Sequence, residues 1–580
     1  MSAQELITEH LDLWTGAVTK TSSSGRGNNG KVELTGLKKL RELILKLAVT
    51  GRLVEQDAGD EPASDLIQRI NAERLKLEGK GKVRATKKAV CANTVEPMPH
   101  AWATCTLGTC ISLISGQHLK GDEYFDDKRP DSIPYLTGPA EYGTRTPEPQ
   151  RHTFERRAVA GKGDILITCK GSGVGKLNIA SEEIAISRQL MAARPILINA
   201  HFLYLLLDSL RDAIREKTVG IAIPGISRGD ILNANIQLPP LDEQHRIVQK
   251  VGELMALCDR LEQQTSDQLE AHETLVDTLL GTLTQSANAT ELADNWARLA
   301  AHFDTLFTTE QSIDKLKQTI LQLAVMGRLV EQDAGDEPTE SLLTKIDQEI
   351  ASLVKQGHIK KPKPTPEISD NDKFFGIPDS WQWVRLGSLA LHSEAGWSPK
   401  CHGAPRENQG WAALKVSAVT WGEFRPDENK ELPSNLTPRP EYEVHPSDFL
   451  ISRANTSELV ARSVVVPKGA PTKLMMSDKI IRFVFSNQVE PLYVNLFNNS
   501  PYARSYYFSV AGGTSSSMKN VSRAQIQALA VPLPPTAEQT RIVQKVGELM
   551  ALCDQLKERL NQASETRYQL AESVVEISLT

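Results

Sequence analysis

Two stretches of the chain carry an apolar stripe with the spacing of a coiled-coil helix. In the first part of each stretch the apolar residues recur at alternating steps of four and three positions, which keeps them on one helix face, and the stripe resumes farther along. The first stripe consists of Ile247, Val251, Leu254, Cys258, Leu261, Leu275, Leu279 and Leu283. The second consists of Ile542, Val546, Leu549, Cys553, Leu556, Leu560, Leu570 and Val574. Each stripe predicts a long helix that packs against partner helices.

Both long helices have a clear predicted start and a predicted partner. Each begins after a Pro-Pro pair, Pro239-Pro240 or Pro534-Pro535, with an acidic residue in its first turn. Similar apolar stripes at about 37–77 and about 313–353 predict the partner helices. Two long antiparallel coiled coils are the simplest arrangement.

The helical segments are duplicated. The string RIVQKVGELMALCD occupies 246–259 and recurs letter for letter at 541–554. The string GRLVEQDAGDEP occupies 51–62 and recurs at 327–338. The glycine that opens the second string stands where a helix would end, and its final proline stands where the next would begin. The chain is therefore predicted to be two tandem halves.

Between the helical segments lie two stretches with a different texture. Short apolar runs such as 164–168 and 449–452, bounded by Gly and Pro, predict strands. The two stretches begin alike, with PHAWATCTLG and PDSWQWVRLG, and end alike, in IQLPPLDEQ and VPLPPTAEQ. The predicted fold class is α/β (α+β). Two α/β domains are separated and supported by long antiparallel coiled-coil helices in a pseudo-twofold internal repeat.

These patterns divide the chain into six expected parts. They are an N-terminal helical region and linker (1–98), a first α/β domain (99–238), a central helical region (239–357), a linker (358–377), a second α/β domain (378–533) and a C-terminal helix (534–580). The basic runs at 80–88 and 360–363 are interpreted as solvated linkers.

Charge and composition narrow the class. Among 580 residues, 66 Lys and Arg against 72 Asp and Glu give a net charge of −6, which excludes coating of nucleic acid by bulk charge. The two α/β domains nevertheless carry small basic excesses. The seven cysteines form no CxxC pair, which argues against a disulfide framework or structural zinc. No apolar run reaches the roughly 18 residues of a membrane helix, and the N-terminus is polar, so we expect a cytoplasmic protein.

Enzyme motifs are not matched. An adenine methyltransferase loop places Asn or Asp before Pro-Pro, but leucine precedes both Pro-Pro pairs of this chain. The cluster KGSGVGK at 170–176 lacks the first Gly and the Ser or Thr of a phosphate-binding P-loop, because Lys170 and Leu177 stand there. The acids of 426–430 are too crowded to share a metal. We therefore expect no catalytic residues, metal or cofactor.

The layout resembles the specificity subunit of type I restriction-modification systems over essentially the whole chain. The resemblance is carried by the two PLPP-EQ-RIV-K helix starts, the GRLVEQ connectors, and the landmarks ISRANTS and SDKIIR. It implies a non-catalytic subunit whose two target-recognition domains each read one half of a bipartite site on double-stranded DNA.

The resemblance also implies partners. The helices would fix the spacing and dock two modification (methyltransferase) subunits, and restriction (translocase/endonuclease) subunits would join them. S-adenosylmethionine, ATP and Mg are expected on those partners. The alternative is a stand-alone two-headed DNA-binding regulator or interaction scaffold.

Candidate DNA-binding residues follow the predicted GDILIT and SDFLIS strands, because phosphates need basic groups and base edges need forked or amide groups. They are Lys170, Ser172, Lys176, Arg188 and Arg228 in the first domain and Arg453, Asn455, Thr456, Ser457, Lys479, Arg482, Lys519 and Arg523 in the second.

Overall fold

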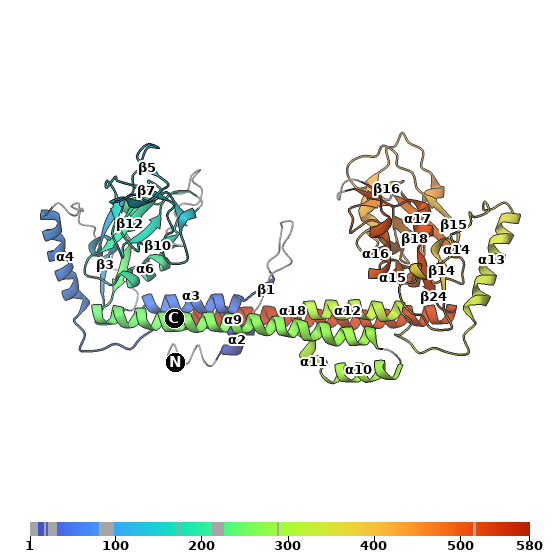
Figure 1. Ribbon diagram of the computed structural model, residues 1–580, viewed down its shortest axis with the longest axis horizontal. Coiled ribbons are helices and arrows are strands. Elements are labelled where there is room, and N and C mark those ends of the chain that lie inside the picture. The colour runs from blue at the N-terminus through green and yellow to red at the C-terminus, as the bar shows by residue number, and fades with distance from the viewer. Residues whose placement is uncertain are drawn as a thin grey trace. The chain divides into compact units, whose positions relative to one another are not determined.

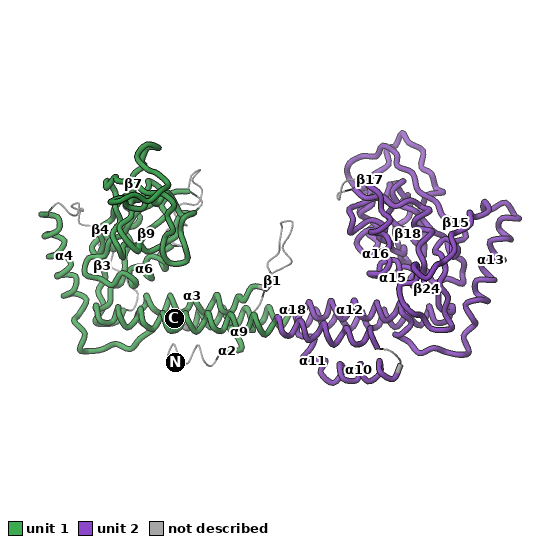
Figure 2. Tube along the Cα trace, in the orientation of Figure 1, with its two compact units in different colours: residues 1–269, 562–580 green, residues 270–561 purple. Residues whose placement is uncertain are grey.

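The computed structural model describes residues 10–16, 19–20, 32–80, 98–171, 173–211, 225–286, 289–513 and 518–579. The chain forms two compact units (Figure 2): Met1–Leu269 with Gln562–Thr580, and Glu270–Asn561. Helices α9 (Leu241–Gln285) and α18 (Thr536–Leu579) each contribute residues to both units. Every helix among the described residues is too short or too polar to span a membrane.

The support of the first unit is a set of helices around one apolar seam (Figure 1). It contains α3 (Thr35–Val49), the first part of α9 and the last part of α18, preceded by α2 (Leu11–Gly16) and the hairpin of β1 (Thr19–Lys20) and β2 (Val32–Glu33). Helix α3 runs antiparallel to α9, since Arg41 bonds Asp259 and Glu262 while Gln56, beyond the end of α3, bonds Glu243.

The support of the second unit repeats this arrangement. Helix α12 (Glu310–Val325) packs on the first part of α18 and on the last part of α9, with α10 (Ala289–Ala301) and α11 (Phe303–Leu306) nearby. Lys317 pairs with Asp554, as Arg41 pairs with the equivalent Asp259. Long apolar stripes thus bury themselves against two neighbours each, which satisfies the coiled-coil prediction.

Each support helix ends in a left-handed turn before the connector. Gly51 has φ +75° and Gly327 has φ +72°, and the next residue's amide bonds back into the helix. A side chain there would meet Pro99 or Pro378 at 2.6 Å, so only glycine fits. After each connector a helix restarts behind the proline, α4 (Ala63–Gly79) and α13 (Thr339–Lys355).

The first head, the α/β domain of the first unit, contains three sheets. The pair β3–β13 links its two ends; the other sheets are the antiparallel β10-β9-β12-β4 and the mixed β5-β7-β6-β11-β8, in which β6 and β11 are parallel. The elements are β3 (Ala103–Thr106), α5 (Leu107–Cys110), β4 (Ile111–Ser115), β5 (Tyr124–Phe125), β6 (Ile133–Leu136), β7 (Arg151–Thr153), β8 (Val159–Ala160), β9 (Ile165–Thr168), β10 (Leu177–Ile179), β11 (Ile184–Ile186), β12 (Leu190–Pro195), α6 (Ala200–Ser209), α8 (Arg228–Leu232) and β13 (Asn235–Leu238).

The second head, the α/β domain of the second unit, has the same topology. The sheet β15-β22-β18-β20 matches β4-β12-β9-β10, and β17-β16-β21 matches β7-β6-β11, including its parallel pair. The elements are β14 (Gln382–Arg385), α14 (Leu386–Leu389), β15 (Ala390–Ala395), β16 (Ala412–Leu414), β17 (Asn429–Glu431), β18 (Phe449–Ser452), β19 (Ala454–Asn455), β20 (Ser463–Val465), β21 (Leu474–Met475), β22 (Ile480–Phe485), α15 (Pro491–Asn498), α16 (Pro501–Val510), β23 (Lys519–Asn520), α17 (Arg523–Gln527) and β24 (Ala530–Leu533).

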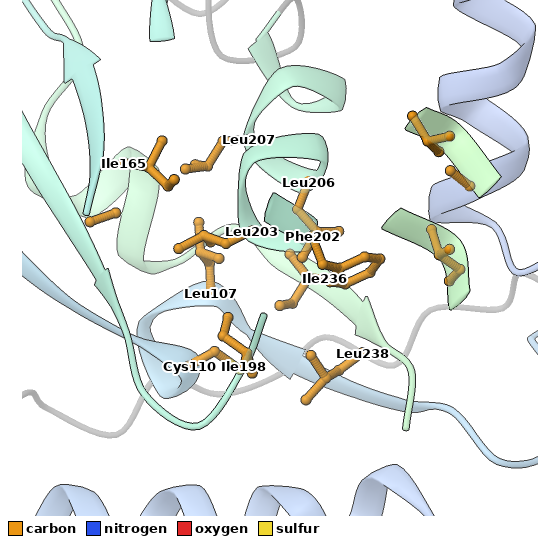
Figure 3. Close-up of a cluster of buried hydrophobic side chains, with 14 of the residues drawn as sticks. Leu107, Cys110, Ile165, Ile198, Phe202, Leu203, Leu206, Leu207, Ile236 and Leu238 are labelled. Atoms are coloured by element: carbon orange, nitrogen blue, oxygen red, sulfur yellow. The ribbon is translucent and has the colours of Figure 1, made fainter. Parts of the chain in front are cut away.

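An apolar core anchors the first head to its support. Figure 3 shows side chains of α6 directed toward those of α5, β9 and β13. The labelled residues are Leu107, Cys110, Ile165, Ile198, Phe202, Leu203, Leu206, Leu207, Ile236 and Leu238. The same buried cluster continues into Leu37 and Leu40 of α3, so the head and the support of this unit share one core.

The predicted α/β heads and antiparallel coiled-coil supports are confirmed, but the stripes differ in one detail. Leu275 and Leu570 were expected in the seam and are 49% and 52% exposed. Their neighbours Val276 and Ala571 are buried instead. The seam moves by one residue because a straight α-helix drifts relative to a strict heptad pattern.

The segment 358–377, expected to be a linker, lies partly against the second head. Phe374 and Phe375 pack on Trp383 and Tyr502, and Asp372 forms an ion pair with Arg385 at 2.8 Å. The exposed lysines at 360 and 361 precede this packed part.

The seam shift gives a paired test. Leu254→Asp should lower the free energy of unfolding by several kcal/mol, because it buries an unpaired charge. Leu275→Asp, at an exposed position of the same helix, should change it by less than about 0.5 kcal/mol. Urea unfolding followed by circular dichroism measures both. Equal losses in the two variants would show that the seam does not shift.

Candidate nucleic-acid interface

The two heads present equivalent loops after their central strands. The loop 169–176 follows β9, and the loop 453–462 follows β18. Each closes through a left-handed residue, Gly175 or Ala461, whose amide donates to the last residue of the strand, at 2.9 Å and 2.8 Å. A short bridge holds the start of each loop, Lys170 to Gly225 and β19 to β23. The sequence therefore builds one loop frame twice and fills it with different side chains.

In the first head, three candidates expose basic side chains near this frame. Lys170 and Lys176 lie on the loop, and Arg188 lies just before β12. Strand β12 pairs with β9, so the three cations share the strand ends of one sheet. Ser172 lies outside the described residues.

In the second head, the loop candidates are more enclosed. Arg453, Asn455, Thr456 and Ser457 are half-buried, and the side-chain oxygen of Asn455 accepts from the Thr456 amide at 2.8 Å. The buried Nε of Arg453 has no hydrogen-bond partner among the described residues. Its backbone amide donates to the carbonyl of Lys479 at 2.9 Å, which brings exposed Lys479 beside the loop.

Two candidates occupy matching places and bond to protein. Arg228 begins α8 and donates to the Leu113 carbonyl at 2.8 Å; Arg523 begins α17 and donates to the Ser393 carbonyl at 3.0 Å. Each arginine thus fixes the edge strand of its sheet, β4 or β15. Lys519 similarly donates to the Gly513 carbonyl at 2.7 Å.

Arg482 lies inside the second head. Its guanidinium pairs with Asp448 at 3.0 Å and with Glu394, and donates to the carbonyl of Glu443 at 2.7 Å. Its side chain is 9% exposed. These bonds hold β22 to β15, so we leave Arg482 out of the proposed interface.

Exposed aromatic and arginine pairs were not anticipated from the sequence. Arg129 lies over the Phe125 ring at 4.0 Å, beside Phe154, which is 53% exposed. In the second head Arg425 lies 5.6 Å from the ring of Trp421, also 53% exposed. Figure 1 shows β5 and β7 at the end of the first head away from α3. Planar cations and rings of this kind suit nucleic-acid bases and backbone. The sequence did not predict these pairs because their residues form no recognisable motif along the chain.

Each head is joined to its own support by a buried carboxylate. Glu243, in the first turn of α9, accepts from the Trp102 indole at 3.0 Å and from Gln56 at 2.6 Å. In the second unit Glu538 accepts from Trp381 at 2.9 Å and from Gln332. The tryptophan comes from the head, the glutamine from the connector and the carboxylate from the support. We call these two clusters the joints.

An ion pair reinforces each joint. Arg246 donates twice to Asp60, at 3.0 Å and 2.6 Å, and Arg541 donates to Asp336 at 3.0 Å and 2.7 Å. The aspartates are almost fully buried. All these residues belong to the duplicated strings or to the segments with which both heads begin and end alike, so the duplication itself was the available signal.

The electrostatics of the joints follow from burial. Burial raises the pKa of Glu243 and of Glu538 above the usual 4.5, while the hydrogen bonds from glutamine and tryptophan oppose the rise. In the described residues no group of three or more His, Cys, Asp or Glu could hold a metal. The described heads therefore offer cations, amides and rings for binding.

Comparison with known proteins gives the class of this two-headed arrangement. The family described as "Type I restriction modification DNA specificity domain" matches residues 99–271 and 378–565. The Escherichia coli type I restriction enzyme EcoEI specificity subunit is 40% identical over the full length of both chains, and the EcoAI specificity subunit of the same species is 36% identical over the same extent. A solved HsdS subunit from Thermoanaerobacter tengcongensis is 23% identical over 45% of this chain and 62% of its own, with a TM-score of 0.25.

The chain belongs to the type I restriction-modification specificity subunits, which are non-catalytic DNA-recognition subunits. The resemblance drawn from the repeats and landmarks is thereby confirmed. These relatives do not support the alternative hypothesis of a stand-alone regulator.

The joints give the chain a pH dependence with a definite sign. A carboxyl whose folded pKa is raised makes the folded protein bind more protons than the unfolded chain just above pH 4.5, so the free energy of unfolding falls as pH rises through the folded pKa. Glu243→Gln with Glu538→Gln should remove this part of the fall. Urea unfolding from about pH 4 to about pH 7 measures it. Glu253→Gln, on the exposed face of α9, is the control and should keep the wild-type slope; an unchanged slope in the double variant would contradict the assignment.

Proposed function

We propose that each head reads one half of a bipartite site on double-stranded DNA and that the helices set the gap between the halves. The observation that carries the proposal is the contrast between the joints and the loops. The joints repeat residue for residue, whereas loop 169–176 and loop 453–462 share a backbone frame and differ in side chains. A bipartite site requires heads that are held at a fixed spacing and that recognise different bases.

We propose separate roles for the loop residues. Lys170, Lys176 and Lys479 suit phosphates, because lysine is a mobile point charge. Arg453 and Asn455 suit base edges, because forked and amide groups can form two hydrogen bonds to one base. Arg228 and Arg523 act by holding the edge strands of the sheets from which these loops project, and Lys519 acts by holding the Gly513 carbonyl. Ser172, Thr456 and Ser457 remain loop candidates.

We further propose that the duplicated face of the trailing helices docks two modification subunits. The exposed residues of this face are Gln249, Gly252, Glu253 and Ala256 in α9 and Gln544, Gly547, Glu548 and Ala551 in α18. A side chain on either glycine would meet nothing within 4 Å. Glycine within a helix costs about 1 kcal/mol relative to alanine. Glycine in both copies, with no steric need among the described residues, supports close approach by an identical partner at each.

The remaining parts of the complex follow from this assignment. Restriction subunits would join the modification subunits, and S-adenosylmethionine, ATP and Mg would be bound by those partners. The division proposed for the chain is 1–98, 99–238, 239–357, 358–377, 378–533 and 534–580, with the second and fifth parts as target-recognition domains. We propose the cytoplasm as the site of action.

Exchange of one head tests the two-reader function. Replacing 378–533 by the corresponding domain of another member should change one half of the methylated sequence and leave the other half and the gap unchanged. The reason is that Glu538 and Gln332 of the joint lie outside the exchanged segment, so an incoming domain that carries tryptophan at the place of Trp381 is held in the same position. Mapping methylated adenines in cells that also carry the modification subunit measures the outcome. If the whole methylated sequence stayed the same, the two-reader proposal would be abandoned.

Bulky substitutions at the two glycines test the docking face. Gly252→Leu should raise helix propensity by up to about 1 kcal/mol and yet block one modification subunit, so that each chain binds one copy. Gly547→Leu should do the same at the other face, and the double variant should bind none. Native mass spectrometry measures the stoichiometry, and thermal unfolding checks the fold. Two bound subunits in the double variant would place docking elsewhere.

A further inference from the structure

The second head contains a cavity of about 240 Å³ with a basic lining. Lys415, Lys430 and Lys479 contribute to its wall, together with Ser477. Its apolar wall includes Pro399 and Ala413. The cavity lies around β16 and β17, which Figure 2 and Figure 1 show at the end of this head away from α12.

Strand registers give the equivalent positions in the first head. Ala413 pairs with Met475 and Lys430, and Tyr135 pairs with Ala185 and Arg151 in the same parallel and antiparallel relations. The amides of Gln117 and Trp397 donate to the carbonyls of Ile186 and Met476, so the preceding residues Ala185 and Met475 are equivalent. Ala413 is therefore the counterpart of Tyr135. The Tyr135 side chain is buried in the first head in a cluster with Leu119, Ile133 and Ala185. The cavity of the second head corresponds to the place that this ring fills.

The partner of that ring has changed as well. The Leu119 amide donates to the Tyr135 hydroxyl at 3.3 Å. Counting from the equivalent glycines Gly116 and Gly396, whose neighbours make matching backbone bonds, Leu119 corresponds to Pro399. Proline has no amide hydrogen to donate. Both members of the contact were thus replaced in a way that leaves the space open.

The polar lining differs in the same direction. Ser187 of the first head donates its hydroxyl to the Thr137 carbonyl. Its counterpart Ser477 has a buried hydroxyl without a hydrogen-bond partner among the described residues. The counterparts of Lys415 and Lys479 are the uncharged Thr137 and Gln189. The second head has therefore gained two positive charges and an unused hydroxyl around the opened space.

The lysines are only partly neutralised by protein carboxylates. Lys415 lies 3.7 Å from Glu428, and Lys479 lies 3.2 Å from Asp478. Lys430 forms no ion pair with any described residue. A hollow with excess ammonium groups at its wall and an unbonded hydroxyl suits a compact anion.

We propose that this cavity binds one backbone phosphate of the DNA half-site that the second head reads, a contact that the first head does not make in the same way. The proposal rests on the DNA-reading function proposed above and names a ligand group for it. The cavity adjoins the reading loop, since the Arg453 amide donates to the Lys479 carbonyl and Lys479 lines the cavity. A phosphate held there fixes the register of the loop on the bases.

Neutral substitution of single phosphates provides the test. The full chain, assembled with its modification subunits, is titrated by fluorescence anisotropy with duplexes that carry its methylated sequence and one methylphosphonate at a time. In the wild-type complex, one position in the second half-site should weaken binding about tenfold, because a charge-assisted contact is lost. In Lys430→Gln the same methylphosphonate should add less than about twofold, and the salt slope should fall by about one.

Two further variants separate charge from shape. Ala413→Tyr restores the residue of the first head, fills the cavity without changing charge, and should remove the same methylphosphonate effect. Ser477→Ala keeps the cavity and should reduce the effect, and it covers the case in which Ala413→Tyr fails to fold. Lys468→Gln, on an exposed loop outside the cavity lining, is the matched control and should respond as the wild type does.

The outcomes separate this proposal from the function on which it rests. If Lys430→Gln and Ser477→Ala respond to every methylphosphonate as the wild type does, while sequence-specific binding persists, the phosphate site is overturned and DNA reading stands. A changed methylated sequence with an unchanged salt slope in Lys430→Gln would assign the cavity to a base and also overturn the proposal. Loss of sequence-specific binding in the wild-type complex would overturn the DNA-reading function itself.

Discussion

The buried carboxylate of each joint is the interaction on which the rest of each unit depends. Glu243 and Glu538 accept an indole proton from the head and an amide proton from the connector while belonging to the support. A buried carboxylate is stable only when such donors surround it. The geometry of three segments distant in sequence is therefore fixed at one point in each unit. The loops proposed to bind DNA are then positioned by sheets whose edge strands Arg228 and Arg523 hold.

Much of this architecture could be predicted because repetition and periodicity report directly on burial. The helix starts, the turn glycines and the strands 164–168 and 449–452 follow from local rules that tertiary structure did not override. The shift of the seam at Leu275 could not be predicted, because the drift that causes it accumulates over several turns of helix. The packing of Phe374 and Phe375 on the second head was also missed, since the segment around them has a linker composition.

The candidate interface was less predictable than the fold. The lysines of the loops were predicted because they follow strands. The sequence alone, however, does not show whether the side chain of a basic residue is exposed to solvent. Arg482 and Arg453 lie in similar landmarks, yet the first is bonded to Asp448 and Glu394 and the second has an unbonded Nε. The cavity beside Ala413 could not be predicted from the sequence. The strand registers of both heads are needed to show that Ala413 stands where the first head has the ring of Tyr135.

The identity of the two joints also governs how recognition fails. Two clusters with the same donors, the same ion pair and the same direction of pKa shift weaken under the same conditions of heat or rising pH. Both heads would then lose their orientation together, and the complex would no longer recognise DNA. A chain with unlike joints would pass through a state with one ordered head. In that state one half-site would still be recognised, and many non-target DNA sites would be bound. Chemical sameness at the two joints is in this sense a safeguard of fidelity.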